Sequence, residues 1–369
     1  MSNTSKHHQI SQTLLEELSA GKYKASGRLP SEAQLVERFR VSRPTVARAL
    51  RELQDQGLIE RRAGSGSYLR KGRSTLKNQR QLGLLVPELG GTEIFELICG
   101  DLARLARVHD FGLLWGNGDD DDTSRIAGQD AAEALCEQYI QRKVNGVFFA
   151  PFERLDNRDE LNVRLADRLR QAGICVVLLD RDLHPFPTRS EYDLVGVDNF
   201  AGGYQLAAHL LKLGYKRIKF LTNPNAAPTV TLRIAGAFTA ITNKSFCSIS
   251  DFVLEHDASD PKLLQKLRGR SPTEAVLCAN DQIAAELIKS AHKAEIRVPQ
   301  DLAIVGFDDV KYASLLSVPL TTMHQPCREI AAVAFRAMLD LLEDRDLPPR
   351  SYSLPSRLIV RESCGAYLQ

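Results

Sequence analysis

The chain has 369 residues, of which 43% are apolar and 25% charged, so it is long enough to bury more than one hydrophobic core. No tract is biased in composition, which excludes a fibrous or largely disordered protein. The formal net charge of +2 conceals an uneven distribution, because residues 1–80 carry 16 Lys and Arg against 7 Asp and Glu, whereas the remainder carries 32 against 39. A basic head of +9 on a body of −7 favours a nucleic-acid partner for the head, since binding a polyanion releases its counterions.

The first ten residues, MSNTSKHHQI, lack the apolar segment of a signal peptide, and no apolar run approaches the roughly 20 residues that span a bilayer. We therefore expect a cytoplasmic protein with no membrane partner. Seven cysteines without a CxxC pair indicate buried thiols ahead of disulfides, and eight histidines without HExxH spacing indicate no metal site. We expect no cofactor.

Residues 31–53 have the pattern of two short helices joined by a tight turn. Ser31, followed three residues later by Gln34, predicts a capping box at the start of the first helix. Ser42 can cap the second helix, in which Pro44 lies in the first turn, where its missing N–H costs little. The second helix has an apolar stripe made of Val46, Ala49, Leu50 and Leu53.

Two short strands are expected next, at residues 58–62 and 67–70. The segment between them, AGSG, contains glycines that permit the backbone geometry of a hairpin tip. Two helices followed by a hairpin predict a winged helix-turn-helix domain over residues 1–70.

The segment LPSEAQLVERFRVSRPTVARALRELQDQGLIERRAGSGSY resembles the DNA-binding domain of the GntR family of bacterial regulators, and the resemblance covers residues 9–70. It implies that Arg43 and Thr45 lie against the major groove and its phosphates and that the wing glycines approach the minor groove. Ala33 and Ala47 stand at two positions where the family often has a DNA-contacting Arg, and we expect Arg48 to substitute in part. A winged helix used for protein contact is the alternative, and the basic charge favours DNA. The candidate DNA-binding residues are Ser31, Ser42, Arg43, Thr45, Arg48, Gly64, Ser65 and Gly66.

After a polar linker at residues 71–81, the pattern changes to short apolar runs that alternate with helical segments over residues 82–369. The runs are LGLLV, FGLLW, GVFFA, ICVVLL, LVGV, IKFL, DFVLE, AVLCA and LAIVGF. Continuous apolar strands are typical of parallel sheets covered by helices on both faces. Nine such strands predict an α/β domain of two doubly wound halves.

Polar residues follow several of these strands, at the edge where open α/β sheets bind ligands. They are Asn117, Asp180, Arg181, Asn280, Asp281, Asp308 and Asp309. Carboxylates, carboxamides and a guanidinium suit a neutral polyhydroxylated ligand such as a sugar, because each can bind hydroxyl groups as donor or acceptor. The alternative is a set of helix caps and turn residues, which is the main expectation for Asp281 and Asp309.

Six ordered segments resemble motifs of the LacI/GalR effector domain, which has the periplasmic-binding-protein fold. They read LLDRD, VGVDNFAGGYQLAAHLLKLGYKRIKFL, TLRIAGAF, AVLCANDQIAAELI, VPQDLAIVGFDD and LTTMHQP. The resemblance implies effector contacts by the matching residues, and the aromatic near the first strand matches Phe95. The candidate effector-binding residues are Phe95, Asp180, Arg181, Arg233, Asn280, Asp308 and Gln325.

Three further features have two interpretations each. Asp119–Asp122 is expected to be a solvated loop and not a cation site. Trp115 could stack on a sugar ring, although a buried core role is the stronger expectation. The segment at residues 95–108 has core spacing, and in the resembled family this region helps to form a dimer.

We therefore predict a homodimeric transcription regulator, a repressor that leaves double-stranded operator DNA when a sugar binds. An enzyme that acts on a sugar or nucleotide, with a DNA-binding head, is the alternative. No GxSxG, P-loop or GxGxxG pattern supports catalysis, and we assign no catalytic residue. The linker RSTLKNQRQ also lacks the pattern of the DNA-wedging helix of LacI-type regulators.

Overall fold

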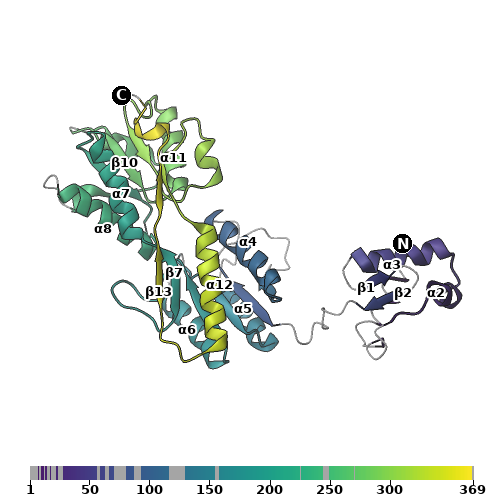
Figure 1. Ribbon diagram of the computed structural model, residues 1–369. Helices are drawn as coiled ribbons and strands as arrows, with labels where there is room; N and C mark the ends of the chain where they lie inside the picture. Colours follow the sequence, from purple (N-terminus) through teal and green to yellow (C-terminus); the bar gives the residue numbers. More distant parts are fainter. Residues whose placement is uncertain are drawn as a thin grey trace. The chain divides into compact units, whose positions relative to one another are not determined.

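The computed structural model describes residues 7, 10–11, 13–14, 17, 22–23, 28–55, 59–62, 66–69, 80–86, 93–115, 129–153, 158–224, 226–243, 249–269 and 271–367. The chain divides into two compact units, Met1–Gln79 and Arg80–Gln369 (Figure 1). Of the segment expected to be a linker, residues 71–79 lie outside the described residues. The first strand of unit 2 begins at Gln81, one residue before the expected start.

Unit 1 contains the expected helix pair and hairpin. Its elements are α2 (Glu32–Phe39), α3 (Arg43–Asp55), β1 (Ile59–Arg62) and β2 (Gly66–Leu69). The capping box is confirmed, because Ser31 Oγ accepts a hydrogen bond from the Gln34 N–H (3.3 Å) and Gln34 Oε1 accepts one from the Ser31 N–H (2.8 Å). Arg40 ends α2 in the left-handed region, with φ of 50°, and turns the chain toward α3.

The core of unit 1 lies beneath α3. The predicted stripe is buried, with Val46, Ala49, Leu50 and Leu53 at most 1% exposed, and it packs with residues of α2 and β1 in one cluster. β1 and β2 pair antiparallel, with Ile59 opposite Leu69. The segment before α2 also joins this hairpin, because the Leu29 N–H donates to the Ser67 carbonyl over 2.9 Å. The wing is thereby fixed to the helices.

Unit 2 has two parallel sheets, as expected. The first sheet has the strand order β13-β7-β6-β5-β3-β4, and each neighbouring pair is parallel. Its strands are β3 (Gln81–Leu85), β4 (Gly112–Trp115), β5 (Gly146–Phe149), β6 (Cys175–Leu179), β7 (Asp193–Val197) and β13 (Ser351–Leu354). Because β3 lies between β4 and β5, the order reverses there, as in doubly wound folds.

Helices cover both faces of the first sheet. They are α4 (Glu93–Val108), α5 (Gln129–Arg142), α6 (Arg158–Gln171) and α12 (Cys327–Glu343). Consecutive strand residues alternate between the two layers: Leu84 is buried in the cluster that includes α4 and α12, whereas Leu85 is buried with α5 and α6. This alternation explains why the central strands β3, β5 and β6 are mostly apolar, since their side chains are covered on both faces of the sheet.

The second sheet has the order β11-β10-β8-β9 and is also parallel. Its elements are β8 (Ile218–Thr222), β9 (Val253–Glu255), β10 (Ala275–Cys278), β11 (Ala303–Val305), α7 (Asn199–Lys212), α8 (Pro228–Thr242), α9 (Ile249–Phe252), α10 (Pro261–Leu267), α11 (Asp281–Lys293), η1 (Lys311–Ser314) and η2 (Glu362–Cys364). Figure 1 shows α7 and α8 on one side of β10 and α11 on the other.

The chain passes between the two halves of unit 2 three times. It crosses after β7, again between β12 (Thr322–His324) and α12, and finally between β13 and β14 (Arg357–Ile359). β12 and β14 pair antiparallel beside the second half, whereas β13 extends the first sheet next to β7. Of the strands described in unit 2, the nine from β3 to β11 were expected from the sequence and are confirmed. The strands β12, β13 and β14 were not expected.

Candidate functional site

The candidate DNA-binding residues of unit 1 lie at the starts of its two helices. Ser31 caps α2, as described above. Ser42 precedes α3, where its Oγ lies 2.8 Å from Thr45 Oγ1 and its carbonyl accepts from the Thr45 N–H. Arg43 is 79% exposed, and its Nε donates to Glu32 Oε2 over 3.3 Å. Arg48 is exposed one turn further along the same helix.

The structure therefore presents hydroxyl and guanidinium groups at the amino end of α3, where helix-turn-helix domains contact DNA. Of the three wing residues, Gly66 begins β2, whereas Gly64 and Ser65 lie outside the described residues.

In unit 2, the first half of the candidate effector site is a triad of charged side chains. The Arg181 side chain is 5% exposed and pairs with Asp180 Oδ2 through Nε (3.0 Å) and Nη2 (2.9 Å). Its Nη1 lies 2.6 Å from Glu153 Oε2, in an ion pair without hydrogen-bond alignment. Burial lowers the pKa of the Arg181 guanidinium, but the two carboxylates outweigh burial and raise it. Arg181 is therefore held charged and oriented.

The local backbone explains how Asp180 reaches this position. Asp180 follows β6 with φ of 68°, and its N–H donates to the Val195 carbonyl of β7 over 2.8 Å. A side chain at Gly196 would place its Cβ 3.0 Å from the Asp180 carbonyl oxygen, so glycine allows the two backbones this approach without a shift. Glu153 also follows a strand of this sheet, but it lies four residues beyond the end of β5 and not directly after it, and sequence reasoning missed it.

The second half of the site is built around Arg233, on α8. Its Nε donates to Asn199 Oδ1 (2.8 Å), its Nη1 donates to the Ala279 carbonyl (2.7 Å), and its guanidinium carbon lies 3.8 Å from the centre of the Phe307 ring. Arg233 Nη1 also lies 3.8 Å from Asp308 Oδ1. Within the described residues, Nη2 makes no hydrogen bond, although the Arg233 side chain is only 7% exposed.

Asp308 follows β11 and is held near Arg233 by hydrogen bonds to Met323 of β12 and to Gln325 just after it. Its φ of 124° is unusual for a residue other than glycine, and its N–H donates to the Met323 carbonyl over 2.8 Å. Gln325 Nε2 donates to Asp308 Oδ1 over 2.7 Å. Burial raises the pKa of the Asp308 carboxyl to about 6, and Asp180 and Glu153 add to the rise while Arg233 and Gln325 oppose it.

Asp180 and Glu153 of the first cluster thus add to the raised pKa of the Asp308 carboxyl in the second cluster. The structure brings five of the seven candidate effector residues into these two clusters: Asp180, Arg181, Arg233, Asp308 and Gln325. Phe95 is 2% exposed, and its ring lies beneath Arg181, 5.8 Å from the guanidinium carbon. Asn280 caps α11, since its Oδ1 accepts from the Ile283 N–H over 2.9 Å.

The remaining polar residues at the strand ends make structural contacts. Asp281 is fully buried and accepts from Thr322 Oγ1 (2.5 Å) and the Val310 N–H (3.0 Å). Asp309 pairs with Arg361 (2.7 Å) and lies 2.9 Å from His324 Nδ1. Asn117 and Asp119–Asp122 lie outside the described residues.

The core role expected for Trp115 is wrong, because this side chain is 49% exposed. β4 is an edge strand, and Trp115 is its last residue, so the helices that bury the centre of the sheet do not cover it. By contrast, six cysteines are described as free thiols, five of them buried and Cys175 half-buried, as the sequence indicated.

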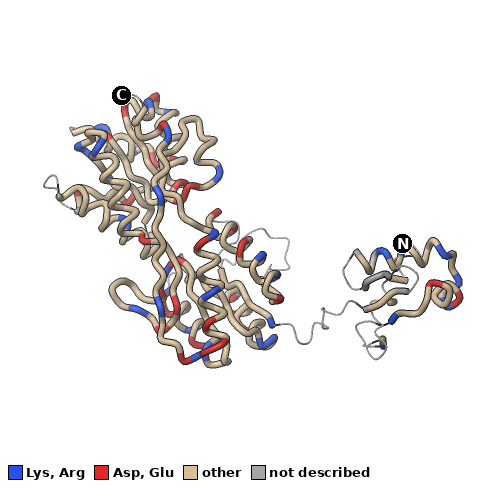
Figure 2. The backbone as a smooth tube through the Cα atoms, in the orientation of Figure 1, with Lys and Arg blue, Asp and Glu red and all other residues tan. Residues whose placement is uncertain are grey.

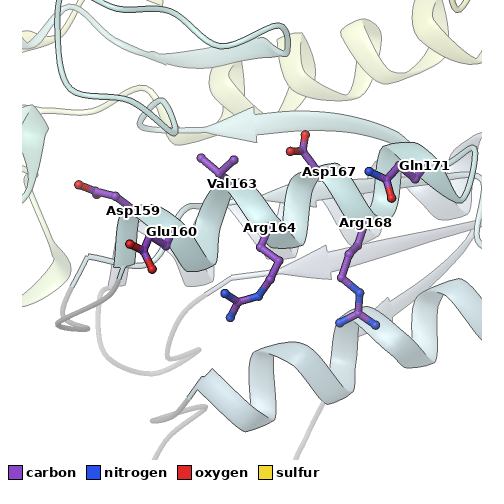
Figure 3. A pocket seen from close by; sticks show the side chains of 7 residues that line it. All are labelled: Asp159, Glu160, Val163, Arg164, Asp167, Arg168 and Gln171. Carbon is purple, nitrogen blue, oxygen red and sulfur yellow. The ribbon is translucent and has the colours of Figure 1, made fainter.

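A separate hollow lies along the outer face of α6 (Figure 3). It is lined by Asp159, Glu160, Val163, Arg164, Asp167, Arg168 and Gln171. Arg164 and Arg168 pair with Glu133 and Glu137 of α5, each at 2.6 Å, so the charges of this surface neutralise one another. It contains none of the candidate residues, and the buried clusters of charged groups define the better binding site.

In the described part of the chain, no group of three or more His, Cys, Asp or Glu side chains is arranged to hold a metal ion. No helix in that part is long and apolar enough to cross a membrane.

Comparison with known proteins matches both units. Residues 6–69 match the profile of bacterial regulatory proteins of the gntR family, and residues 207–364 match that of a periplasmic binding protein-like domain. Over 355 residues the chain is 25% identical to an arabinose metabolism transcriptional repressor from Geobacillus stearothermophilus, covering 93% of this chain and 92% of that protein.

Two solved structures have the fold of unit 2. A GntR transcription regulator from Chromobacterium violaceum is 24% identical, with a TM-score of 0.62, over 77% of this chain and 99% of that one. A LacI family regulator from Enterococcus faecium, solved with bound ribose, is 22% identical, with a TM-score of 0.61, over 77% of this chain and 98% of that one.

These matches define the class: the chain is a transcription regulator that joins a GntR-type helix-turn-helix domain to a periplasmic-binding-protein-like effector domain. The combination predicted from the sequence is confirmed. In particular, it is the combination that aligns along nearly its whole length with the arabinose metabolism repressor.

Proposed function

We propose that this chain is a repressor whose affinity for operator DNA falls when a sugar or sugar derivative binds between the two halves of unit 2. It acts in the cytoplasm and has no catalytic role. The observation that carries the proposal is the relation of Arg233 to Asp308, which lie 3.8 Å apart and are both mostly buried. A polar ligand that bonds to both groups would replace the water they lose on burial.

A polyhydroxylated ligand fits the chemistry of this site. Arg233 and Arg181 supply donors, Asp180 and Asp308 supply acceptors, and Gln325 supplies both. Hydroxyl groups of a sugar can donate to the carboxylates and accept from the guanidiniums at the same time. The name of the Geobacillus repressor refers to arabinose and the Enterococcus structure contains ribose, which supports the same class of ligand.

We also propose a homodimer. α4 buries one side against the first sheet, but Leu97 and Val108 on this helix are 41% and 65% exposed. Apolar groups exposed on a helix are consistent with a subunit contact. A dimer would also present two heads to the two half-sites of an operator.

A thermal-shift screen against pentoses, hexoses and their derivatives tests the ligand class, because a ligand that binds only the folded state raises its stability by RT ln(1 + [L]/Kd). Arg233→Ala should abolish the shift and leave operator binding intact. An unchanged shift in a folded Arg233→Ala variant would remove this residue from the site. No shift with any sugar would contradict the sugar proposal.

The head is tested separately. Arg43→Ala should cost roughly 1–3 kcal/mol on the selected operator and relax the preference at one base position. Lys71→Ala should instead weaken binding to every duplex evenly and lower the salt slope by about one. Equal losses for Arg43→Ala on operator and random duplex would show that α3 does not read sequence.

A further inference from the structure

Four exposed cations gather at one edge of the first sheet. Arg80 directly precedes β3, Arg107 lies in the last turn of α4 before β4, and Arg142 with Lys143 ends α5 before β5. All four side chains are exposed. Because β5, β3 and β4 are parallel neighbours, their amino ends share an edge, and the four cations lie along it.

Short turns fix the positions of these residues. The Gly112 N–H donates to the Arg80 carbonyl over 2.9 Å, which ties the start of β4 to Arg80. On the other side, the Asn145 N–H donates to the Gln81 carbonyl (2.7 Å), and the Gln81 N–H donates to Asn145 Oδ1 (2.8 Å). Arg80 therefore lies between the turn that follows α4 and the turn that follows α5.

The cations at the other end of the same edge, Arg170 and Arg350, both form ion pairs with carboxylates. Arg170 pairs with Glu191 (2.6 Å) and Asp167 (3.3 Å), while Arg350 pairs with Asp193 (2.7 Å) and Asp340 (2.9 Å). By contrast, no ion pair joins Arg80, Arg107, Arg142 or Lys143 to any other residue that the structure describes.

Helix geometry accounts for part of this arrangement. α4 and α5 both end at this edge, and cations near the carboxyl end of a helix are favoured by its dipole. That effect explains Arg107 and Arg142, but it does not explain Arg80, which belongs to no helix. It also does not explain why an otherwise acidic body, with 39 Asp and Glu against 32 Lys and Arg beyond residue 80, gives these cations no acidic partner among the described residues.

The position of the edge in the chain points to the partner. Arg80 is the first residue of unit 2, so the DNA-binding head is covalently joined to this edge. Figure 2 shows Lys and Arg in blue at the end of unit 2 where the chain enters it. DNA bound by the head is thereby held at high effective concentration around these cations. The last residues of unit 1 add Lys71, Arg73 and Lys77 to the sequence that leads to this edge.

We propose that Arg80, Arg107, Arg142 and Lys143 form a second DNA-contact surface, which binds phosphates of the duplex beside the half-site held by the head. The inference rests on the proposed DNA-binding function of the head. The surface reads no sequence, because its partners are phosphates. It adds affinity that depends on salt and on the length of DNA that flanks the half-site.

The test uses the full-length protein and a duplex enriched by it from a random-sequence pool. One form of this duplex is trimmed to its required sequence, and the other is extended at both ends by about 15 bp, roughly one and a half helical turns. Arg142→Gln with Lys143→Gln should weaken binding to the extended duplex and lower its slope of log K against log salt by up to about 1.8, since each phosphate contact contributes about 0.9. Binding to the trimmed duplex should not change.

Lys289→Gln with Lys293→Gln, at exposed positions of α11, is the matched control, because it removes the same charge from the second half of unit 2. This pair should leave both duplexes unaffected. Three results would overturn the proposal. The Arg142 and Lys143 variant could keep the wild-type salt slope on the extended duplex, it could lose the same affinity on the extended and the trimmed duplex, or it could lose no more affinity than the Lys289 and Lys293 control. Failure of the head itself is distinguishable, because then the wild-type protein enriches no sequence and Arg43→Ala changes nothing.

Discussion

The carboxylate of Glu93 accepts a hydrogen bond from the backbone N–H of Lys311 over 3.0 Å. Glu93 begins α4 in the first half of unit 2, and Lys311 begins η1 in the second half. This contact therefore joins the halves directly, in addition to the three segments of chain that cross between them. It favours the arrangement in which Asp180 and Glu153 influence Asp308.

Removing this contact should weaken effector binding. Glu93→Ala removes a hydrogen bond worth about 0.5–1.5 kcal/mol, so the Kd of the sugar found by thermal shift should rise roughly two- to tenfold. Glu96→Ala is the control, because Glu96 also lies in the first turn of α4 and shares its helix-dipole interaction. Titration calorimetry measures both. Equal Kd values for the two variants would show that the contact does not favour the bound arrangement.

The pH dependence of stability should report on Asp308. Burial raises its folded-state pKa to about 6, above the roughly 3.9 of an unfolded Asp, so the folded chain binds more protons between about pH 4 and 6. The stability contributed by this carboxyl is thus present at low pH and is lost as pH rises through about 6. Asp308→Asn removes that contribution, so the difference in Tm between variant and wild type should change across this range. A Tm difference between Asp308→Asn and wild type that stays constant from pH 4.5 to 7.5 would contradict the raised pKa of Asp308.

Two glycines should respond in opposite directions to the same substitution. A Cβ at Gly203 of α7 would lie 2.1 Å from the Arg233 carbonyl oxygen, whereas a Cβ at Gly100 of α4 would meet nothing within 4 Å. Gly203→Ala should cost about 2–3 kcal/mol and displace Arg233. Gly100→Ala should stabilise the chain by about 0.5–1 kcal/mol, because alanine has the better helix propensity.

Urea unfolding measures both glycine variants, and effector affinity provides a second readout for Gly203→Ala. Its affinity should fall together with stability, since the close contact of α7 with α8 positions the Arg233 side chain. A destabilised variant with normal effector affinity would separate this packing from the site.

The segment that joins the two units should determine how strongly effector changes operator binding. A long flexible Gly/Ser segment inserted after Lys77 should reduce the effect of effector on operator binding while it preserves effector affinity, because a flexible chain no longer transmits the spacing of two heads. Ser74→Ala is the control, because it changes the sequence of the same segment without adding length or flexibility. A full effector response in the insertion variant would rule out head spacing as the mechanism.

Much of the fold could be predicted from local patterns. The Ser31 and Gln34 capping box, the α3 stripe and the nine apolar strands all depend on residues near one another in sequence, and all are confirmed. β13 was not expected because the segment SYSL is short and polar at alternate positions. It is a strand because it pairs with β7, which lies far away in the sequence: the Arg350 N–H, just before β13, donates to Asp193 at the start of β7, 157 residues earlier in the chain.

The site was predictable to a similar extent. Asp180, Arg181 and Asp308 follow apolar strands, so their shared edge could be derived from the strand pattern. Arg233 lies within α8, and only the family resemblance singled it out. Glu153 lies four residues beyond the end of β5, and its pairing with Arg181 depends on the distance between two loops, which no local pattern encodes.

The late position of β13 has a consequence for the synthesis of the protein. The sheet that begins with β3 at Gln81 is completed at its edge only by residues 351–354. A ribosome that stops before this point releases a chain whose head is complete but whose sensor lacks a strand. Truncation before β13 therefore separates the two proposed activities, since it leaves the proposed DNA-binding unit whole and the proposed ligand-binding unit without its edge strand.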